Sequence, residues 1–145
     1  MNFEVTKYQP VEIPIPSGFT GTEITFPNQP SLYNKKIKAI EVYSEVSMPK
    51  SPLTFTDTLP YSDGVNSFLE FFDGNNQKVN RVPYAVLNRV NDQTNGFVFE
   101  VYKCNDWLIS WDKCKLIFST PPATTPAVLT VGVYYEDLEF TRPLR

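Results

Sequence analysis

The sequence predicts an all-β protein, an antiparallel sandwich of about eight strands with jelly-roll or related Greek-key topology. Three observations support this fold class. The chain of 145 residues has the length of one domain. Its 13 prolines disfavour long helices, because a proline inside a helix loses a hydrogen bond and clashes with the preceding turn. Short runs of β-branched and aromatic residues recur about every 8–12 residues, separated by turns that contain proline or glycine.

The first 34 residues differ from the rest of the chain because they mix prolines with apolar residues. Five of the 13 prolines lie at positions 10, 14, 16, 27 and 30, which predicts extended or polyproline backbone. This stretch is too apolar for a free linker, so it must be buried on the domain's own sheet edge or on a neighbouring subunit. We expect an extended arm over residues 1–34 and a β-sandwich domain over residues 35–145. The expected intermolecular contacts are Phe3, Val5, Ile13, Ile15 and Phe19.

Alternating side chains predict the first strands. Residues 22–26 alternate between polar and apolar and form a candidate first strand. Residues 37–48 are apolar on both faces, which favours a central strand of a sandwich. Residues 53–59 also alternate and are either an edge strand or an ordered loop.

A hairpin is predicted in the middle of the chain. The Asp73-Gly74-Asn75-Asn76 sequence is typical of a tight turn, and β-prone runs flank it at residues 67–72 and 78–82. Residues 84–90 follow a proline and are either one helical turn or an irregular strand.

The last part of the chain holds four further predicted strands. Alternation predicts strands at residues 97–102, 116–118 and 127–136. Asn105-Asp106 is expected to turn the chain into a strand at residues 107–111, with Trp107, Ile109 and Trp111 on one face.

Composition excludes several classes of function. The chain has no histidine, so it has no Ser-His-Asp or Cys-His catalytic unit and no histidine-ligated zinc. We therefore expect a non-enzymatic protein without cofactor or metal. Cys104 and Cys114 are expected to be buried and reduced, with a disulfide as the alternative.

Charge and hydropathy restrict the partners. The net charge of -3 is well mixed along the chain and no basic stripe exists, so we expect no nucleic-acid partner. The longest nearly apolar stretch is far shorter than the roughly 20 residues of a membrane-spanning helix. The N-terminus lacks the apolar core of a signal peptide. A cytoplasmic product, or one assembled there into a larger particle, is expected.

Two further functions arise from side-chain chemistry. The chain contains 11 Phe, 8 Tyr and 2 Trp. Most of these aromatic residues are expected in the core, but exposed ones would suit a carbohydrate-binding β-sandwich module, which is the alternative function. The candidates for a sugar platform are Tyr8, Tyr33, Tyr61, Tyr84, Trp107, Trp111 and Tyr134. A small hydrolase acting through Glu136 or Asp137 ranks third, because acidic residues at a strand end are common on protein surfaces.

Three segments resemble small β-sandwich structural proteins of bacteriophage virions, closest to those of phages that infect Bacteroidetes-type hosts. These segments are residues 37–43 (IKAIEVY), 108–117 (LISWDKCKLI) and 131–135 (VGVYY). The resemblance implies a capsid-associated penton, spike-base, decoration or head auxiliary protein without catalytic residues. It implies a homo-oligomer, with a trimer or pentamer plausible, that docks on a major capsid protein. The implied location is the virion, assembled in the host cytoplasm.

Overall fold

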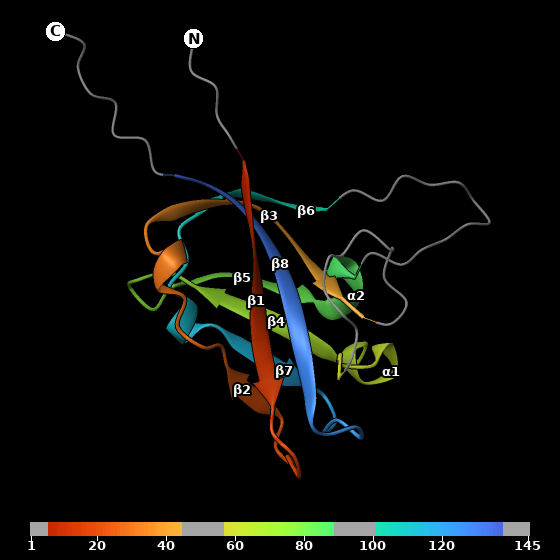
Figure 1. The fold of residues 1–145 in the computed structure, drawn as a ribbon. Helices are drawn as coiled ribbons and strands as arrows, with labels where there is room; N and C mark the ends of the chain where they lie inside the picture. The colour runs from red at the N-terminus through yellow and green to blue at the C-terminus, as the bar shows by residue number, and fades with distance from the viewer. Residues whose placement is uncertain (1–5, 45–56, 89–100, 138–145) are drawn as a thin grey trace, which may run out of the picture.

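The computed structural model describes residues 6–44, 57–88 and 101–137, and these residues form two antiparallel four-stranded sheets (Figure 1). The all-β sandwich is therefore confirmed. Sheet A has the order β1-β8-β3-β6 and sheet B the order β2-β7-β4-β5. The strands of sheet A are Lys7–Ile15, Ala127–Asp137, Lys35–Tyr43 and Tyr102–Trp107, in that order. Those of sheet B are Glu23–Thr25, Lys115–Phe118, Ser67–Phe72 and Lys78–Pro83.

The strand order is that of a jelly roll. Strand β1 pairs with β8, β2 with β7, β3 with β6 and β4 with β5, all antiparallel. The chain is thus one long hairpin with its tip between β4 and β5, rolled so that successive pairs alternate between the sheets. This arrangement is the double Greek key of eight-stranded jelly rolls.

The described helices are single turns. They are η1 (Pro30–Leu32), α1 (Tyr61–Gly64), α2 (Tyr84–Leu87) and η2 (Trp111–Lys113). Pro60 and Pro83 occupy the N-cap positions of α1 and α2, where a missing N–H removes no helical hydrogen bond. Of the two alternatives for residues 84–90, the helical turn is correct over Tyr84–Leu87.

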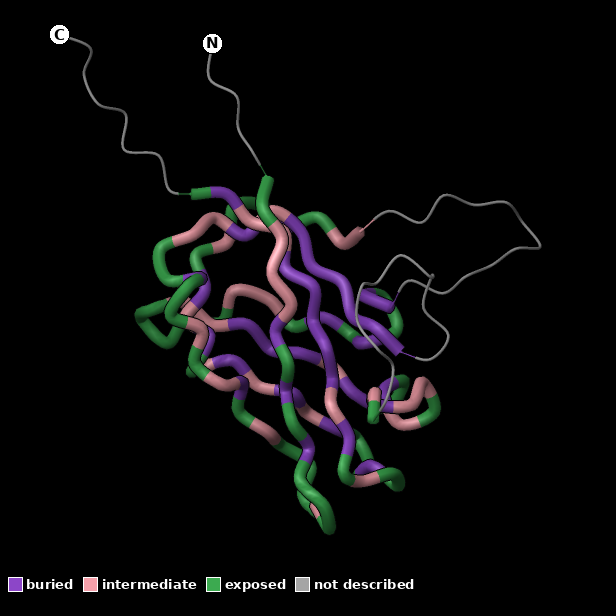
Figure 2. The backbone as a smooth tube through the Cα atoms, viewed as in Figure 1, coloured by how far each residue is buried: buried purple, intermediate pink, exposed green. Residues whose placement is uncertain are grey.

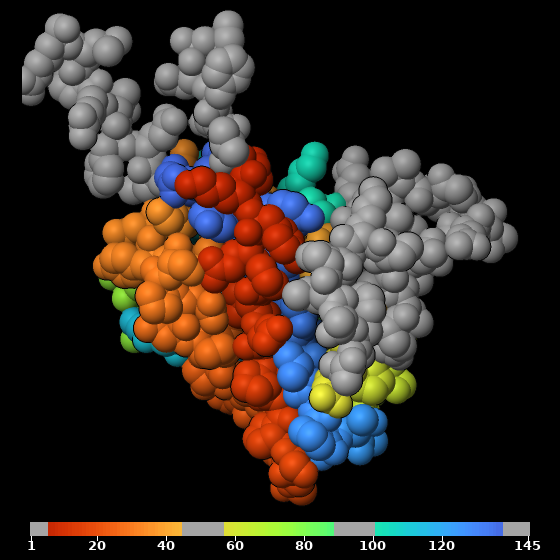
Figure 3. All heavy atoms as spheres, viewed as in Figure 1, coloured from red at the N-terminus to blue at the C-terminus, as the bar shows by residue number. Residues whose placement is uncertain are grey.

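The first strand corrects the prediction of a separate arm. All nine residues of β1 pair with β8, from Lys7 opposite Tyr135 to Ile15 opposite Ala127. Figure 3 shows β1 lying along β8 on this face of the molecule. Strands β1 and β2 therefore belong to the sandwich. Of the two alternatives for this stretch, burial on the domain's own sheet edge is the correct one, and the expected domain boundary at residue 34 is wrong. Residues 1–5 lie outside the described residues.

The prolines of β1 explain the error. Pro10 and Pro14 are four residues apart, so their nitrogens face the same lateral side of the strand. Strand β1 is the edge of sheet A, with β8 as its partner, and the prolines face away from it. Proline is tolerated on such an edge because no ladder hydrogen bond is lost. High proline content is therefore compatible with full pairing on one side.

Strand β6 also differs from the prediction. The expected turn at Asn105-Asp106 lies inside β6, where Asp106 has a positive φ of 50°. The pairing of β3 with β6 shifts register between Ile37 and Ala39, so the extra residues form a bulge instead of a turn. Residues 108–110 are a loop and residues 111–113 are η2, so no strand spans 107–111.

Five of the remaining predicted strands are confirmed, whereas the described parts of the segments at 53–59 and 97–102 contain only an isolated bridge at Thr58 and the first residue of β6, Tyr102. The strands predicted at 22–26, 67–72, 78–82, 116–118 and 127–136 correspond to β2, β4, β5, β7 and β8. The strand predicted at 37–48 corresponds to β3 up to Tyr43. The parts predicted at residues 45–56 and 97–100 lie outside the described residues.

The core lies between the two sheets, where the buried segments face each other (Figure 2). Alternate residues of β1 and β8 point inward, as do Leu69 and Phe71 of β4. Near one end of the core, the ring of Phe26 lies 6.0 Å from Phe71 and 6.1 Å from Trp111. This aromatic cluster lies beneath the loops that join β2 to β3 and β6 to β7.

All four sheet edges carry features that prevent pairing with another strand. Edge β1 has its two prolines, and edge β2 is only three residues long. Edge β5 carries Lys78 and Arg81, and edge β6 carries the bulge at Asp106. Such features prevent edge-to-edge association. Within residues 6–44, 57–88 and 101–137, contacts with other proteins are therefore left to side chains at the two ends and on the two faces of the sandwich.

Candidate functional site

The candidate site is one end of the sandwich, here called the loop-end surface, formed by the β2–β3, β4–β5 and β6–β7 connections. A hollow of about 150 Å³ is lined by Tyr33, Asn34, Gly74, Leu108, Ile109 and Ser110. A second hollow of about 250 Å³ shares three of these residues, Tyr33, Ile109 and Ser110. Its other lining residues are Asn28, Gln29, Trp111 and Asp112. Tyr33 thus borders both hollows.

Two large side chains of this surface are exposed to solvent. The Tyr33 side chain is 74% exposed and that of Leu108 is 50% exposed. Ile109 and Trp111 beneath them are buried. The surface therefore has exposed apolar groups above a packed floor. The indole N–H of Trp111 is buried and has no hydrogen-bond partner among the described residues.

Hydrogen bonds hold the three connections together. The Lys113 ammonium donates to the Gly74 carbonyl at 3.0 Å, which joins the β6–β7 connection to the β4–β5 hairpin. The Ser110 backbone N–H donates to the Phe72 carbonyl at 2.9 Å. Within the hairpin, the carboxylate of Asp73 accepts two backbone N–H groups at 2.8 and 2.9 Å. The chain's own hydrogen bonds therefore hold the loop-end surface in place before any other molecule binds to it.

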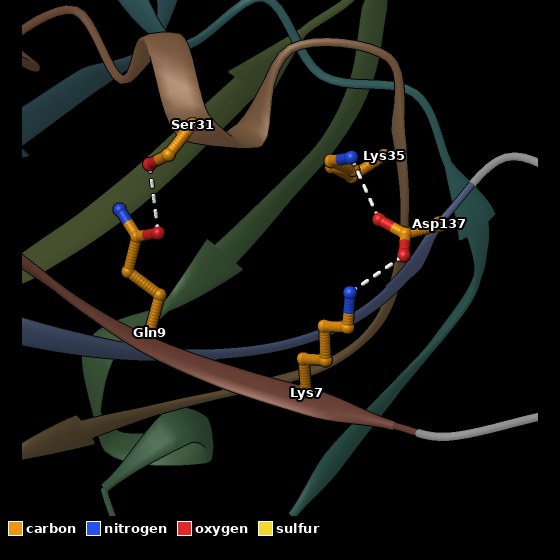
Figure 4. Close-up of polar contacts among 5 residues, drawn as sticks. All are labelled: Lys7, Gln9, Ser31, Lys35 and Asp137. Carbon is orange, nitrogen blue, oxygen red and sulfur yellow. Dashed lines mark hydrogen bonds and ion pairs between the residues drawn. The ribbon is translucent and has the colours of Figure 1, made fainter.

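An ion-pair cluster supports the same end from the side of sheet A (Figure 4). The Asp137 carboxylate lies 2.6 Å from the ammonium groups of both Lys7 and Lys35, so it joins β8 to β1 and β3. Its pKa is lowered to about 2, first by the hydrogen bond from Lys35 and then by that from Lys7. Ser31 of η1 donates to the Gln9 side chain at 2.7 Å.

The two acidic residues of the hydrolase hypothesis do not converge. Asp137 is exposed and holds its two lysines, whereas Glu136 is buried and lies 4.0 Å from the Lys38 ammonium. Neighbouring residues of a strand point to opposite faces of the sheet. A paired-carboxylate site at this strand end therefore has no geometric support.

A second polar cluster lies on the outer face of sheet A. The tyrosine–glutamate cluster consists of Tyr8, Glu41, Tyr43 and Tyr134. The hydroxyls of Tyr43 and Tyr134 donate to one oxygen of the buried Glu41, the latter at 3.1 Å. Tyr8 donates to the Tyr43 hydroxyl at 2.9 Å. Burial, followed by the hydrogen bond to Glu41, raises the pKa of Tyr43.

Gly132 makes room for this cluster. It lies opposite Glu41 in the register of β3 and β8, and a Cβ atom there would come 2.9 Å from the Tyr8 ring. The hydrogen bonds run between the side chains of β1, β3 and β8, so the arrangement fixes the outer face of the sheet.

The structure disperses the other residues singled out by sequence. Ile13 and Ile15 are buried in the chain's own core and Phe19 packs against it, so the first two are not available as subunit contacts. Phe3 and Val5 lie outside the described residues.

The seven aromatic candidates do not form one platform. Tyr84 and Trp111 are buried, and Trp107 and Tyr61 are half-buried against the core. Tyr8 and Tyr134 pair on sheet A with ring centroids 5.0 Å apart. Only Tyr33 among the seven is exposed.

Both cysteines are free and buried, as expected from their small apolar character. Burial raises the pKa of each thiol, Cys104 and Cys114, to about 12. They remain protonated at neutral pH, which fits a packing role.

Sequence reasoning missed most of the loop-end surface. Tyr33 was one of seven sugar-platform candidates but fell within the expected arm, and Leu108 and Ser110 fell within an expected strand. One local indication was the residue type of Asn34, because asparagine tolerates the left-handed backbone of turns. Asn34 does adopt this conformation, with a φ of 57°. The prolines at 27 and 30 also mark a connection.

No protein family, curated protein or solved structure matches the chain. Within residues 6–44, 57–88 and 101–137, no group of three or more Cys, Asp or Glu side chains is placed to hold a metal ion. Among the same residues, no helix has the length and hydropathy needed to cross a bilayer.

Proposed function

We propose that this protein is a non-enzymatic structural component of a bacteriophage virion that self-associates and docks on a major capsid protein. The observation that carries the proposal is the strand order, β1-β8-β3-β6 over β2-β7-β4-β5. Viral capsid domains are among the recurrent uses of eight-stranded jelly rolls, together with lectins and cupins. The resemblance of three sequence segments to small virion proteins, which is an expectation from the sequence, points in the same direction.

The contact surface of this proposal is the end of the sandwich that carries α1 and α2. Val86 of α2 is 57% exposed and Val65, directly after α1, is 44% exposed. The two helices are joined through Tyr61 and Tyr84, whose ring centroids lie 6.0 Å apart. Contiguous exposed apolar surface marks protein contact sites, and we assign Val86 and Val65 to such a surface. The blunted sheet edges leave assembly to such side chains.

The proposal is tested by the mass of the full-length protein in solution. We expect three or five times the chain mass of 16.6 kDa by sedimentation equilibrium. The Val86→Asp variant should shift the mass toward that of the monomer, because a charge would be buried in the contact. Leu108→Asp, a matched change at the opposite end, should leave the mass unchanged.

A monomeric wild type at high protein concentration would overturn self-association. An oligomer of Val86→Asp as stable as the wild type would overturn the placement of the contact at α1 and α2. Circular dichroism of each variant establishes that the sandwich is folded.

A further inference from the structure

We infer that the loop-end surface binds a neutral saccharide, with Tyr33 as the stacking ring and Asn28, Asn34 and Asp112 as hydrogen-bonding partners. This inference goes beyond the structural role proposed above. It concerns the end of the sandwich opposite to α1 and α2, so the two proposals need different surfaces.

The ring of Tyr33 supplies the apolar half of the recognition. It is 74% exposed and borders both hollows, so a ligand in either hollow, or one that spans them, contacts it. A sugar ring presents a face of C–H groups, and an aromatic ring is the side chain that best covers such a flat face. Leu108, also exposed, adds apolar surface beside the first hollow.

The polar groups around the ring suit hydroxyl groups. Among the described residues, the side-chain amides of Asn28 and Asn34 have no hydrogen-bond partner, and each offers donors and an acceptor. The Asp112 carboxylate accepts the Ser110 hydroxyl at 2.8 Å and keeps further acceptor capacity. Sugar hydroxyls both donate and accept, so they match this mixture.

The charge of the surface selects against ionic ligands. Of the residues that line the two hollows, Asp112 is the only charged one. Phosphate and carboxylate groups are recognised by arginine or lysine, and neither type lines the hollows. The nearby Lys113 donates to the Gly74 carbonyl. The surface therefore fits an uncharged polyhydroxyl ligand better than a nucleotide, a phospholipid headgroup or an acidic sugar.

The shape of the surface suits an open chain of sugar units. Each hollow is smaller than the roughly 300–1,000 Å³ of pockets that enclose a drug-sized ligand. Two small hollows that share Tyr33, Ile109 and Ser110 in their lining instead provide adjacent subsites. The buried floor of Ile109 and Trp111, and the hydrogen bonds that join the three connections, keep the subsites in place before binding.

The test is titration calorimetry of the full-length protein with soluble neutral oligosaccharides of glucose, mannose, galactose, xylose and N-acetylglucosamine. At least one series is expected to bind at millimolar concentration or below, with affinity rising with chain length. Tyr33→Ala should weaken that binding about tenfold or more, because a stacked ring contributes on the order of the free energy of a tenfold change. Tyr33→Phe should retain most of it.

Val86→Ala is the matched control, since it removes an exposed apolar side chain from the opposite end. It should leave saccharide affinity unchanged. If the folded protein binds no member of the panel at millimolar concentration, or if Tyr33→Ala binds as tightly as the wild type, the inference is wrong. Neither result bears on the oligomer, which sedimentation of Val86→Asp tests separately.

Discussion

Replacing Ile13 by alanine distinguishes a strand of the sandwich from an arm on its surface. Ile13 is fully buried in β1, opposite Leu129 of β8. If β1 is part of the fold of a single chain, the substitution leaves a cavity between the sheets. If the segment were an arm that contacts a neighbour, the same change would not alter the stability of an isolated chain.

The magnitude follows from the burial of Ile13. The change removes three carbon atoms, and at about 0.8 kcal/mol for each buried methylene the lost transfer free energy is about 2.4 kcal/mol. The cavity left behind adds to this loss, and large-to-alanine core changes cost about 2–5 kcal/mol in all. Against a total stability of about 5–15 kcal/mol, this is a large fraction.

The assay is urea unfolding of wild type and variant, followed by tryptophan fluorescence at a protein concentration low enough to populate monomer. The midpoint should fall with an unchanged slope, and the melting temperature should drop by roughly 6–15 °C. Glu12→Ala, the exposed neighbour on the same strand, is the control and should shift stability by less than about 0.5 kcal/mol. Equal effects of the two substitutions would refute the placement of β1 in the core.

Three further changes test particular contacts. Asp137→Asn should lower stability at neutral pH and leave it similar to wild type near pH 2 in acid titrations followed by circular dichroism. The folded-state pKa of Asp137, about 2, lies below the unfolded-state value of about 3.9. The stabilisation of the fold by ionised Asp137 is therefore present above pH 4 and lost as the pH falls through 2. Gly64→Ala should destabilise by about 1–3 kcal/mol in urea titrations, because its Cβ would lie 2.4 Å from the buried Tyr84 ring. Tyr43→Phe should cost about 1–3 kcal/mol by the same measurement, since the buried Glu41 carboxylate loses a donor. A loss below about 0.5 kcal/mol in either variant, or no change in acid sensitivity for Asp137→Asn, would contradict the corresponding contact.

The strands that were predicted well combine alternation with local turn chemistry. Strands β4 and β5 are joined by Asp73-Gly74-Asn75-Asn76, so the pattern and the turn specify the hairpin together. Strand β8 is long enough for its alternation to exclude a helix. In these segments, neighbouring residues in the sequence specify the strand and its turn, so sequence patterns are sufficient to predict them.

The arm prediction failed because the relevant information is not local. Pro10 and Pro14 exclude hydrogen bonds on one side of the strand only, and the partner on the other side, β8, lies more than a hundred residues later. No pattern within residues 1–34 shows that Ile13 and Ile15 are covered by their own chain. Apolar content correctly predicted burial, but it did not decide between the domain's own sheet edge and a neighbouring subunit.

The loop-end surface was missed for a similar reason. The exposure of Tyr33 is decided by three connections that meet at one end of the jelly roll. Locally, Tyr33 is one tyrosine among eight, and its neighbours do not separate it from the buried Tyr84. The topology of the fold, which places η1 beside the β6–β7 connection, is needed to find the site.

The most direct test of the proposed role is the mass of the full-length protein in solution, measured by sedimentation equilibrium over a wide concentration range. A self-associating virion component predicts three or five copies of the 16.6 kDa chain, reduced toward one copy by Val86→Asp. A wild-type mass of one chain at every concentration would contradict the proposal.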